Sequence, residues 1–317
     1  MFSSLALARR LVIVWALLYA AAGLAGFCQL YSSFAKYDDE GYVLLAVRTY
    51  LAGHPLYDET YTQYGPAYFT AQRIHGVTGW PVTHDVARLK TLASWLLTSL
   101  LAAWIIHRIT GRELLALLAG GTVWLHLDRL GFEPGHPQDL ALLITMVGLC
   151  AAVELPRLRW SGLPGTSVGL GLVTGLLIML KLNLGVLTGL ATVTAMTFQL
   201  RNGLRATWSQ RLLLVACAGL PFALAGRQAL SLPGAALPVA IGVGVIGIWI
   251  ASRRRTILNE CPASPSMAHA EPQLRWRELG IYIACTFLTA ALFGMLALAN
   301  GTSVQGLWHG LIGQHQG

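Results

Sequence analysis

The sequence predicts an all-α fold, a polytopic transmembrane helix bundle with amphipathic helices in its first extracytoplasmic loop. Composition is the first observation: 55% of the 317 residues are hydrophobic and 11% are charged, whereas soluble domains carry about 25% charged residues. The second observation is a mean hydropathy of +0.58. The third is a series of apolar windows that approach the roughly 20 residues a helix needs to cross a bilayer. Together these observations exclude an ordinary soluble domain.

Nine apolar windows are interpreted as spans of a single transmembrane domain, residues 1–317. They cover roughly 11–30, 89–107, 113–127, 138–153, 166–181, 184–200, 211–226, 233–251 and 279–299. One window is short and Pro221 interrupts another, so eight or ten spans are alternatives. The first window is too long for the apolar part of a signal peptide, and we expect a retained anchor.

The distribution of charge predicts that the N-terminus is cytoplasmic. If the spans alternate, 14 of the 22 Lys and Arg residues fall on the cytoplasmic side, where basic residues collect in membrane proteins. Nine of the 14 acids fall on the other side: Asp38, Asp39, Glu40, Asp58, Glu59, Asp85, Asp128, Glu133 and Asp139. We therefore expect a multi-pass protein of the cell inner (plasma) membrane. The net charge of +8 reflects this topology and predicts no nucleic-acid partner.

Residues 31–88 form the predicted first extracytoplasmic loop, which is too long and too patterned for a simple connector. Its first half has the apolar spacing of an amphipathic helix, at Val43, Ala46, Val47, Tyr50 and Leu51. Gly53 and Pro55 prevent that helix from continuing. Two helices lying on the outer membrane surface would fit this pattern.

The second half of the loop predicts an extended segment followed by a shorter helix. Residues 56–63 have the character of an extended stretch. Pro66 suits the first position of the second helix, because proline lacks the N–H that would be unsatisfied there. Gly76 and Gly79 end this helix.

Three consecutive acids, Asp38, Asp39 and Glu40, begin the first of these helices. Asp39 lies four residues before Val43 and is predicted to face the buried side, while its two neighbours point away by about 100° each. An Asp at this position can also act as a helix cap. Capping explains one Asp better than three acids in a row, so a chemical role stays open beside it.

The order of motifs resembles a known family. After the first span come Asp38-Asp39-Glu40-Gly41-Tyr42, then Gly53-His54-Pro55-Leu56-Tyr57, then Tyr64-Gly65-Pro66. This order is similar to that of the polytopic type C (GT-C) glycosyltransferase superfamily. The likeness is greatest to its bacterial branch of mannosyltransferase-like and lipopolysaccharide-modifying enzymes. It covers residues 1–90 in detail and the remainder mainly by topology.

The resemblance implies a general base among the three acids. In that superfamily an Asp in the first outer loop deprotonates an acceptor hydroxyl, which attacks the anomeric carbon of a sugar on a polyprenyl phosphate. Asp39 matches this residue, Asp38 competes with it because the Asp is doubled, and Glu40 completes the catalytic set. A carboxylate in this role needs hydrogen-bond reach to the proton and a pKa tuned by its surroundings.

The next outer loop contributes His136 and Asp139, three residues apart at the start of a span. The resemblance implies that residues here lie near the acceptor or a metal, and a solvated turn is the alternative. A divalent metal is compatible with the family, but one His among scattered carboxylates defines no ligand set. Five cysteines without CxxC spacing indicate neither a zinc site nor a disulfide framework.

Lys181 lies between two apolar windows on the same outer side. A cation at membrane depth is costly and is usually functional, although snorkelling toward head groups is the alternative. The resemblance implies that Lys181 meets the lipid-linked phosphate. Tyr64, from the Tyr-Gly-Pro motif, and Arg73 complete the expected substrate-binding residues.

The implied function is an integral membrane glycosyltransferase that moves a sugar from a polyprenyl-phosphate donor to a lipid or glycan acceptor on the extracytoplasmic face, in contact with membrane lipids. The alternative is a multi-span transporter or flippase of an envelope lipid or glycan. Transport would require ionisable residues at mid-membrane depth and symmetry between halves. Few such charges and no inverted repeat are visible.

Two expectations concern the remaining chain and the site geometry. Residues 252–277 are predicted to form a cytoplasmic loop, and the amphipathic stretch after residue 299 indicates an incomplete chain. If the first outer loop is catalytic, Asp39, His136, Asp139 and Lys181 must converge on one cavity, because a base, an acceptor and a phosphate contact must surround one anomeric carbon.

Overall fold

The computed structural model describes residues 2–32, 39–128, 133–155, 162–199 and 276–311, with isolated positions between 208 and 243. Within these ranges the regular structure is entirely helical, which confirms the predicted all-α fold class. The predicted spans 211–226 and 233–251 lie outside the ranges apart from single positions. The predicted cytoplasmic loop lies outside them as far as residue 275.

The long helices coincide with the predicted apolar windows and extend beyond most of them. They are α1 (Phe2–Ser32), α5 (His84–Thr110), α6 (Glu113–Asp128), α7 (Pro137–Glu154), α8 (Gly162–Leu180), α9 (Leu182–Gln199) and α12 (Trp276–Ala299). In the part of the chain that the structure describes, four helices are long and apolar enough to cross a membrane: α1, α5, α7 and α12. The apolar parts of α8 and α9 are shorter. The chain is therefore a multi-span membrane protein.

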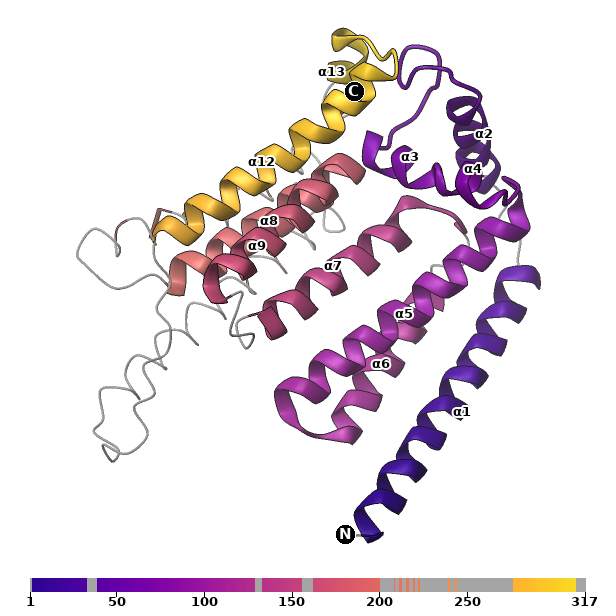
Figure 1. Cartoon of the computed structure of the whole chain (residues 1–317), viewed down its shortest axis with the longest axis vertical. Coiled ribbons are helices and arrows are strands. Elements are labelled where there is room, and N and C mark those ends of the chain that lie inside the picture. Colours follow the sequence, from indigo (N-terminus) through magenta and orange to yellow (C-terminus); the bar gives the residue numbers. More distant parts are fainter. Residues whose placement is uncertain are drawn as a thin grey trace.

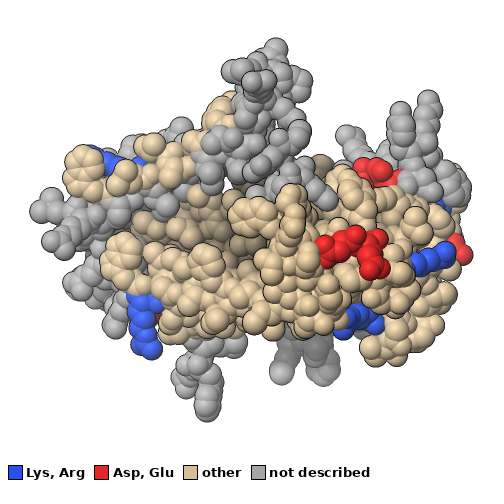
Figure 2. Space-filling model, turned by 90° about the horizontal axis from the view of Figure 1, so that it is seen from above, with Lys and Arg blue, Asp and Glu red and all other residues tan. Residues whose placement is uncertain are grey.

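The long helices alternate in direction, so one end of the bundle collects the polar connections. In Figure 1, α1 runs up to the end where α2 (Asp39–Leu51), α3 (Pro66–Gln72), α4 (Ile74–Thr78) and α13 (Val304–Leu311) lie, and α5 returns from it. We call this the loop end. Helices α7 and α9 begin there, and α8 and α12 finish there. Figure 2 looks onto this end and shows acidic side chains in patches on a largely uncharged surface.

Local signals in the sequence fix where the span α5 begins and ends. The Thr83 hydroxyl accepts a hydrogen bond from the backbone N–H of Val86 (3.4 Å), which caps the first turn. Asp85 adds a negative charge at the positive end of the helix dipole. Gly111, with φ of 66°, ends the helix in the left-handed conformation that glycine adopts without strain.

The two predicted helices of the first loop are present. Helix α2 buries Val43, Ala46, Val47 and Tyr50, which confirms the amphipathic stripe. Pro66 opens the second helical stretch as expected. That stretch is divided into α3 and α4 at Arg73, and it ends at Gly79, where φ is 70°.

The prediction of an extended segment at residues 56–63 is wrong. Leu56 and Thr60 pair across a tight turn, in which the Tyr57 N–H donates to the Thr60 carbonyl at 2.9 Å. Tyr57 adopts a positive φ of 67°, which is uncommon for a non-glycine residue. Its ring packs against Gly310 of α13, and its hydroxyl donates to the Tyr64 carbonyl at 2.8 Å. Contacts with a distant part of the chain thus override the local preference.

The largest buried cluster lies where the first loop meets the spans. Val47 of α2 and Phe69 of α3 pack together with Leu177 and Leu180 near the end of α8, and each of these residues is at most 1% exposed. Burying such side chains contributes about 1.5–3 kcal/mol each. The first loop is therefore packed into the bundle rather than only resting on the membrane surface.

Candidate functional site

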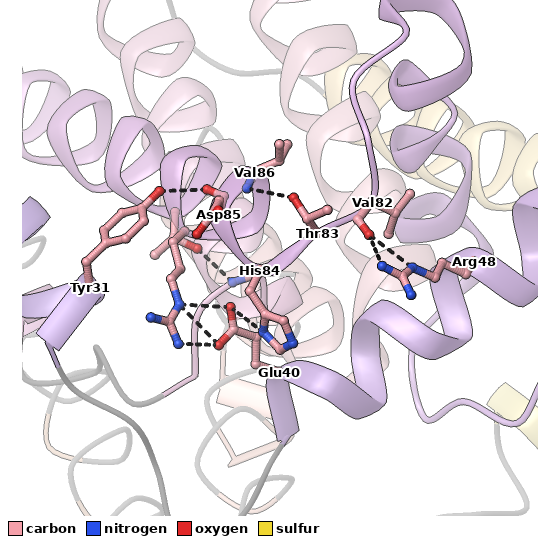
Figure 3. Close-up of polar contacts among 11 residues, drawn as sticks. Tyr31, Glu40, Arg48, Val82, Thr83, His84, Asp85 and Val86 are labelled. Carbon is pink, nitrogen blue, oxygen red and sulfur yellow. Dashed lines mark hydrogen bonds and ion pairs between the residues drawn. The ribbon is translucent and has the colours of Figure 1, made fainter.

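Glu40 connects the start of α2 to α5 through a buried ion pair (Figure 3). Its carboxylate accepts hydrogen bonds from Arg88 at 2.9–3.3 Å and lies 3.2 Å from His84 Nδ1. The Arg88 guanidinium also lies 5.9 Å from the centre of the Tyr31 ring of α1. Because a buried charge is tolerated only when it is paired, this contact holds three helices together.

The predicted orientation of the acids is wrong at two positions. Asp39, expected on the buried side, is exposed, whereas Glu40, expected to point away, is 8% exposed. The physical reason is Arg88, which is 4% exposed on α5 and requires a carboxylate from α2. Asp38 lies outside the described residues. Asp39 makes no hydrogen bond with the described part of the chain, so it does not cap α2.

Five polar side chains from three segments meet at the loop end. They are Tyr64, Glu133, His136, Gln138 and Lys181, and we call them the outer polar cluster. The Tyr64 hydroxyl shares a hydrogen bond with His136 Nε2. Glu133 Oε2 lies 3.7 Å from the same nitrogen. The cluster therefore joins the segment before α3, the start of α7 and the junction between α8 and α9.

Gln138 bridges the members of this cluster. With the amide oriented to satisfy its neighbours, its nitrogen lies 2.5 Å from His136 Nδ1 and 3.2 Å from Glu133 Oε2. Its oxygen then lies 3.0 Å from Lys181 Nζ. The opposite orientation would place the oxygen against a carboxylate and the nitrogen against an ammonium group, so it is disfavoured.

Burial and charge determine the protonation of the cluster. Burial, assisted by the Lys181 charge, lowers the pKa of His136 to about 4, and the negative charge of Asp39 opposes this shift. Burial also lowers the pKa of Lys181, opposed by Glu133. Burial and the charges around it, including Glu133 and Asp39, raise the pKa of Tyr64. At neutral pH, a neutral imidazole and a neutral phenol therefore lie within electrostatic range of Asp39.

Gly65 fixes the position of Tyr64 against the end of α8. Its N–H donates to the Leu180 carbonyl at 3.0 Å, and a Cβ at this position would lie 2.0 Å from the Met179 carbonyl oxygen. Only glycine permits this approach. Lys181 follows Leu180 directly, so the Tyr-Gly-Pro motif is held beside the lysine by backbone contact.

Two predicted residues lie apart from the cluster. The carboxylate of Asp139 accepts hydrogen bonds from Thr91 Oγ1 and Trp95 Nε1, both at 3.0 Å, so its oxygens are directed at α5. Arg73 donates to Asn300 Oδ1 at 2.6 Å and lies over the ring of Tyr50. Both side chains join helices together, and neither contacts the cluster through these bonds.

Glu133 and Gln138 were missed as site residues by sequence reasoning. They lie three residues before and two after His136, so proximity in sequence was the available signal. Their residue types did not indicate a role in the site. The bridging role of Gln138 depends on Lys181, which is 43 residues further along the chain.

Two apolar cavities lie among the spans rather than at the cluster. Each has a volume of about 280 Å³, one between α1, α5 and α6 and the other between α8, α9 and α12. No group of three or more His, Cys, Asp or Glu side chains within the described ranges could hold a metal ion.

The fold and the site define a class, a multi-span membrane protein with a polar cluster at one end of its bundle. Comparisons of the chain with protein-family models, with curated proteins and with solved structures gave no match. The resemblance to type C glycosyltransferases therefore stays a prediction, and it rests on the quoted motifs.

Proposed function

We propose that the chain is an integral membrane glycosyltransferase, which moves a sugar from a polyprenyl-phosphate donor to an acceptor on the extracytoplasmic face. The observation that carries this proposal is the meeting of Tyr64, His136 and Lys181 at one end of the bundle, within electrostatic range of Asp39. Asp39 acts on the pKa values of Tyr64 and His136, and Lys181 acts on that of His136. They come from separate segments, and such convergence is what chemistry at one carbon requires.

Asp39 is the proposed general base. It is exposed, and none of the hydrogen bonds described for the protein engages its carboxylate, so it is available to an acceptor that arrives from water. Glu40 was the third acid of the predicted catalytic set, and its oxygens are occupied by Arg88 and His84. We assign Glu40 to holding α2 in place, with Asp38 as the alternative base.

Lys181 is the proposed contact to the donor phosphate. It lies at the junction of α8 and α9, and a cation between apolar helices is usually functional. In the transfer step, the acceptor O–H proton moves to Asp39 and the acceptor oxygen bonds to the anomeric carbon. The bond from that carbon to the phosphate oxygen breaks, and its electron pair leaves with the polyprenyl phosphate.

The proposal places the loop end outside the cell and the N-terminus in the cytoplasm, in the cell inner membrane. Helix α5 ends at the opposite end of the bundle (Figure 1). Its last turn carries Arg108, which pairs with Glu154 at 2.5 Å, and Arg112 precedes α6. Basic residues at this end agree with the usual excess of Lys and Arg on the cytoplasmic side.

The decisive experiment is Asp39→Asn, assayed by transfer of radiolabel from the lipid-linked sugars of the producing cells in isolated membranes. We expect turnover to fall by about 10²–10⁴-fold, the usual contribution of a general base. Glu59→Gln, which alters another exposed acid at the loop end, is the matched control and should keep activity.

Asp38→Asn distinguishes the two candidate bases. Loss of activity in this variant alone would move the base by one residue. Normal turnover in both variants would refute the enzyme. Flux of a labelled envelope lipid through reconstituted vesicles, without transfer, would favour the transporter instead.

A further inference from the structure

The hydrogen bonds of the outer polar cluster have a direction, and Lys181 sets it. An ammonium group can only donate, so the Gln138 atom that lies 3.0 Å from Lys181 Nζ is the amide oxygen. The amide nitrogen must then face Glu133 and His136, and a carboxylate can only accept. Two charged residues thus fix the orientation of one neutral amide.

The amide fixes the tautomer of His136. Because the Gln138 nitrogen donates to Nδ1 at 2.5 Å, Nδ1 carries no proton. A neutral imidazole has one N–H, which is therefore on Nε2. Burial lowers the pKa of His136 to about 4, so the ring is neutral at physiological pH.

The tautomer in turn fixes the role of Tyr64. His136 Nε2–H donates to the phenol oxygen in the hydrogen bond that the two residues share. The hydroxyl proton of Tyr64 must point elsewhere. No side chain or carbonyl in the described ranges accepts it, although Tyr64 is only 8% exposed. Within the described ranges, this donor is therefore left for a ligand oxygen.

The charge balance favours a neutral ligand over an anion at this donor. The charged side chains that influence the pKa values of Tyr64, His136 and Lys181 are Asp39, Glu133 and Lys181. Two carboxylates face one ammonium group, so a further anion would be repelled at the phenol. A sugar hydroxyl or ring oxygen can accept the bond without this cost.

We propose that Tyr64 donates a hydrogen bond to an oxygen of the transferred sugar and thereby selects which sugar the site accepts. The identity of the ligand rests on the proposed glycosyltransferase function, whereas the direction of the hydrogen bonds does not. The proton stays on the phenol, because burial and nearby negative charge raise the pKa of Tyr64. Fixed donors discriminate strongly, since a sugar that lacks the matching oxygen leaves the donor unpaired.

The direction of the bonds is tested by ¹⁵N NMR of the histidine-labelled protein in detergent, with His136 assigned by comparison with His136→Gln. We expect a neutral ring protonated at Nε2. In Gln138→Glu, a carboxylate accepts from both Lys181 and the ring, so the proton should move to Nδ1. An Nδ1–H ring in the wild type would overturn the inference and leave the proposed function standing.

The ligand is tested by transfer assays on Tyr64→Phe, with Tyr61→Phe as the control because Tyr61 is 63% exposed. We expect kcat/KM to fall about 10–100-fold in Tyr64→Phe. Gln138→Glu should lower kcat/KM by a similar factor, because the Tyr64 proton then bonds to His136. The double variant should fall no further, because both changes remove the same hydrogen bond. Tyr61→Phe should keep wild-type transfer.

Binding of sugar-free polyprenyl phosphate distinguishes a contact of Tyr64 with the sugar from a contact with the phosphate. Tyr64→Phe should leave this binding unchanged, and weaker binding would mean that the phenol contacts phosphate, which overturns the sugar contact. A wild type with the Nε2–H ring and no transfer activity would instead refute the glycosyltransferase, and the sugar contact with it.

Discussion

At the scale of single residues, Asp39 and Glu40 show how neighbouring acids acquire different roles. Glu40 faces Arg88 inside the protein and stabilises it, while Asp39 remains exposed near the outer polar cluster. Neither side chain can replace the other, because adjacent positions on a helix point about 100° apart.

We predict that Glu40→Gln strongly destabilises the protein. Removing one partner of a buried ion pair costs about 3–5 kcal/mol, because the remaining charge loses its compensation. Thermal unfolding in detergent measures the effect. Glu59→Gln is the control, since its contact with His54 is more than half exposed on both sides and is worth at most about 1 kcal/mol. Equal unfolding temperatures for the two variants would contradict the assignment.

We predict that the contribution of His136 to stability falls as the pH falls from about 6.5 to about 4. The pKa of His136 is about 4 in the folded protein and about 6.5 in an unfolded chain. Between these values the unfolded state binds more protons, so acid favours unfolding by up to about 3 kcal/mol. Lys181 reinforces the shift and Asp39 opposes it.

Chemical denaturation at several pH values, compared with His136→Gln, measures this contribution. His75, whose pKa is also lowered by burial, is common to both proteins. Only the difference between the two proteins is therefore attributed to His136. A variant with the same pH dependence as the wild type would show that His136 has the same pKa in the folded protein as in the unfolded chain.

At the scale of elements, the contact between the Tyr64-Gly65-Pro66 segment and α8 supports the candidate site. Tyr64 reaches His136 only while Gly65 stays against the carbonyls of Met179 and Leu180. A rigid backbone on both sides leaves no flexible side chain that could yield.

We predict that Gly65→Ala destabilises the protein by about 3 kcal/mol or more, since its Cβ would lie 2.0 Å from the Met179 carbonyl oxygen. Gly76→Ala is the matched control. Nothing lies within 4 Å of a Cβ at Gly76, and alanine there should stabilise α4 by up to about 1 kcal/mol. The unfolding temperatures of the purified variants measure both effects. An unchanged unfolding temperature in Gly65→Ala would mean that α3 can move away from α8.

The helices were predictable from the sequence because their causes are local. A span must be apolar over its length and must satisfy its own backbone hydrogen bonds, so the window 89–107 identified α5, which covers His84–Thr110. The stripe of α2 was predictable for the same reason, since each position follows from its neighbours.

The details of the candidate site were not predictable, because their causes are distant in the sequence. Glu40 turns inward because of Arg88, 48 residues away, and Asp139 turns to Trp95, 44 residues away. The turn at Tyr57 depends on Gly310. A single sequence carries no signal for such pairs.

At the scale of the whole molecule, the alternating helices predict which segments face the same side of the membrane. Glu59 lies between α2 and α3, which are at the loop end, and Arg112 lies between α5 and α6, which meet at the opposite end (Figure 1). In a protein with its five natural cysteines replaced by alanine, Glu59→Cys should react with an impermeant maleimide on intact cells. Arg112→Cys should react only after permeabilisation. The reverse pattern would show that the loop end faces the cytoplasm, which would contradict the proposed extracytoplasmic site.

The contact between Asp58 and Ser303 has a consequence for how the protein is made. The Asp58 carboxylate accepts hydrogen bonds from the N–H and the hydroxyl of Ser303, at 2.6 and 2.7 Å, across 245 residues of chain. At roughly 5–20 residues per second, the ribosome reaches Ser303 on the order of ten to fifty seconds after Asp58. During this interval Asp58 is without its partner, although the segment of the first loop that packs on α8 already has its own.

A chain stopped after residue 275 lacks α12 and α13. It should still insert its early spans, but a protease added from outside should cleave within residues 53–60. The full chain should resist cleavage there. Equal resistance in both would mean that the loop matures early. If the loop waits, its residues around Asp58 reach their final contacts only after α12 and the start of α13 have been made.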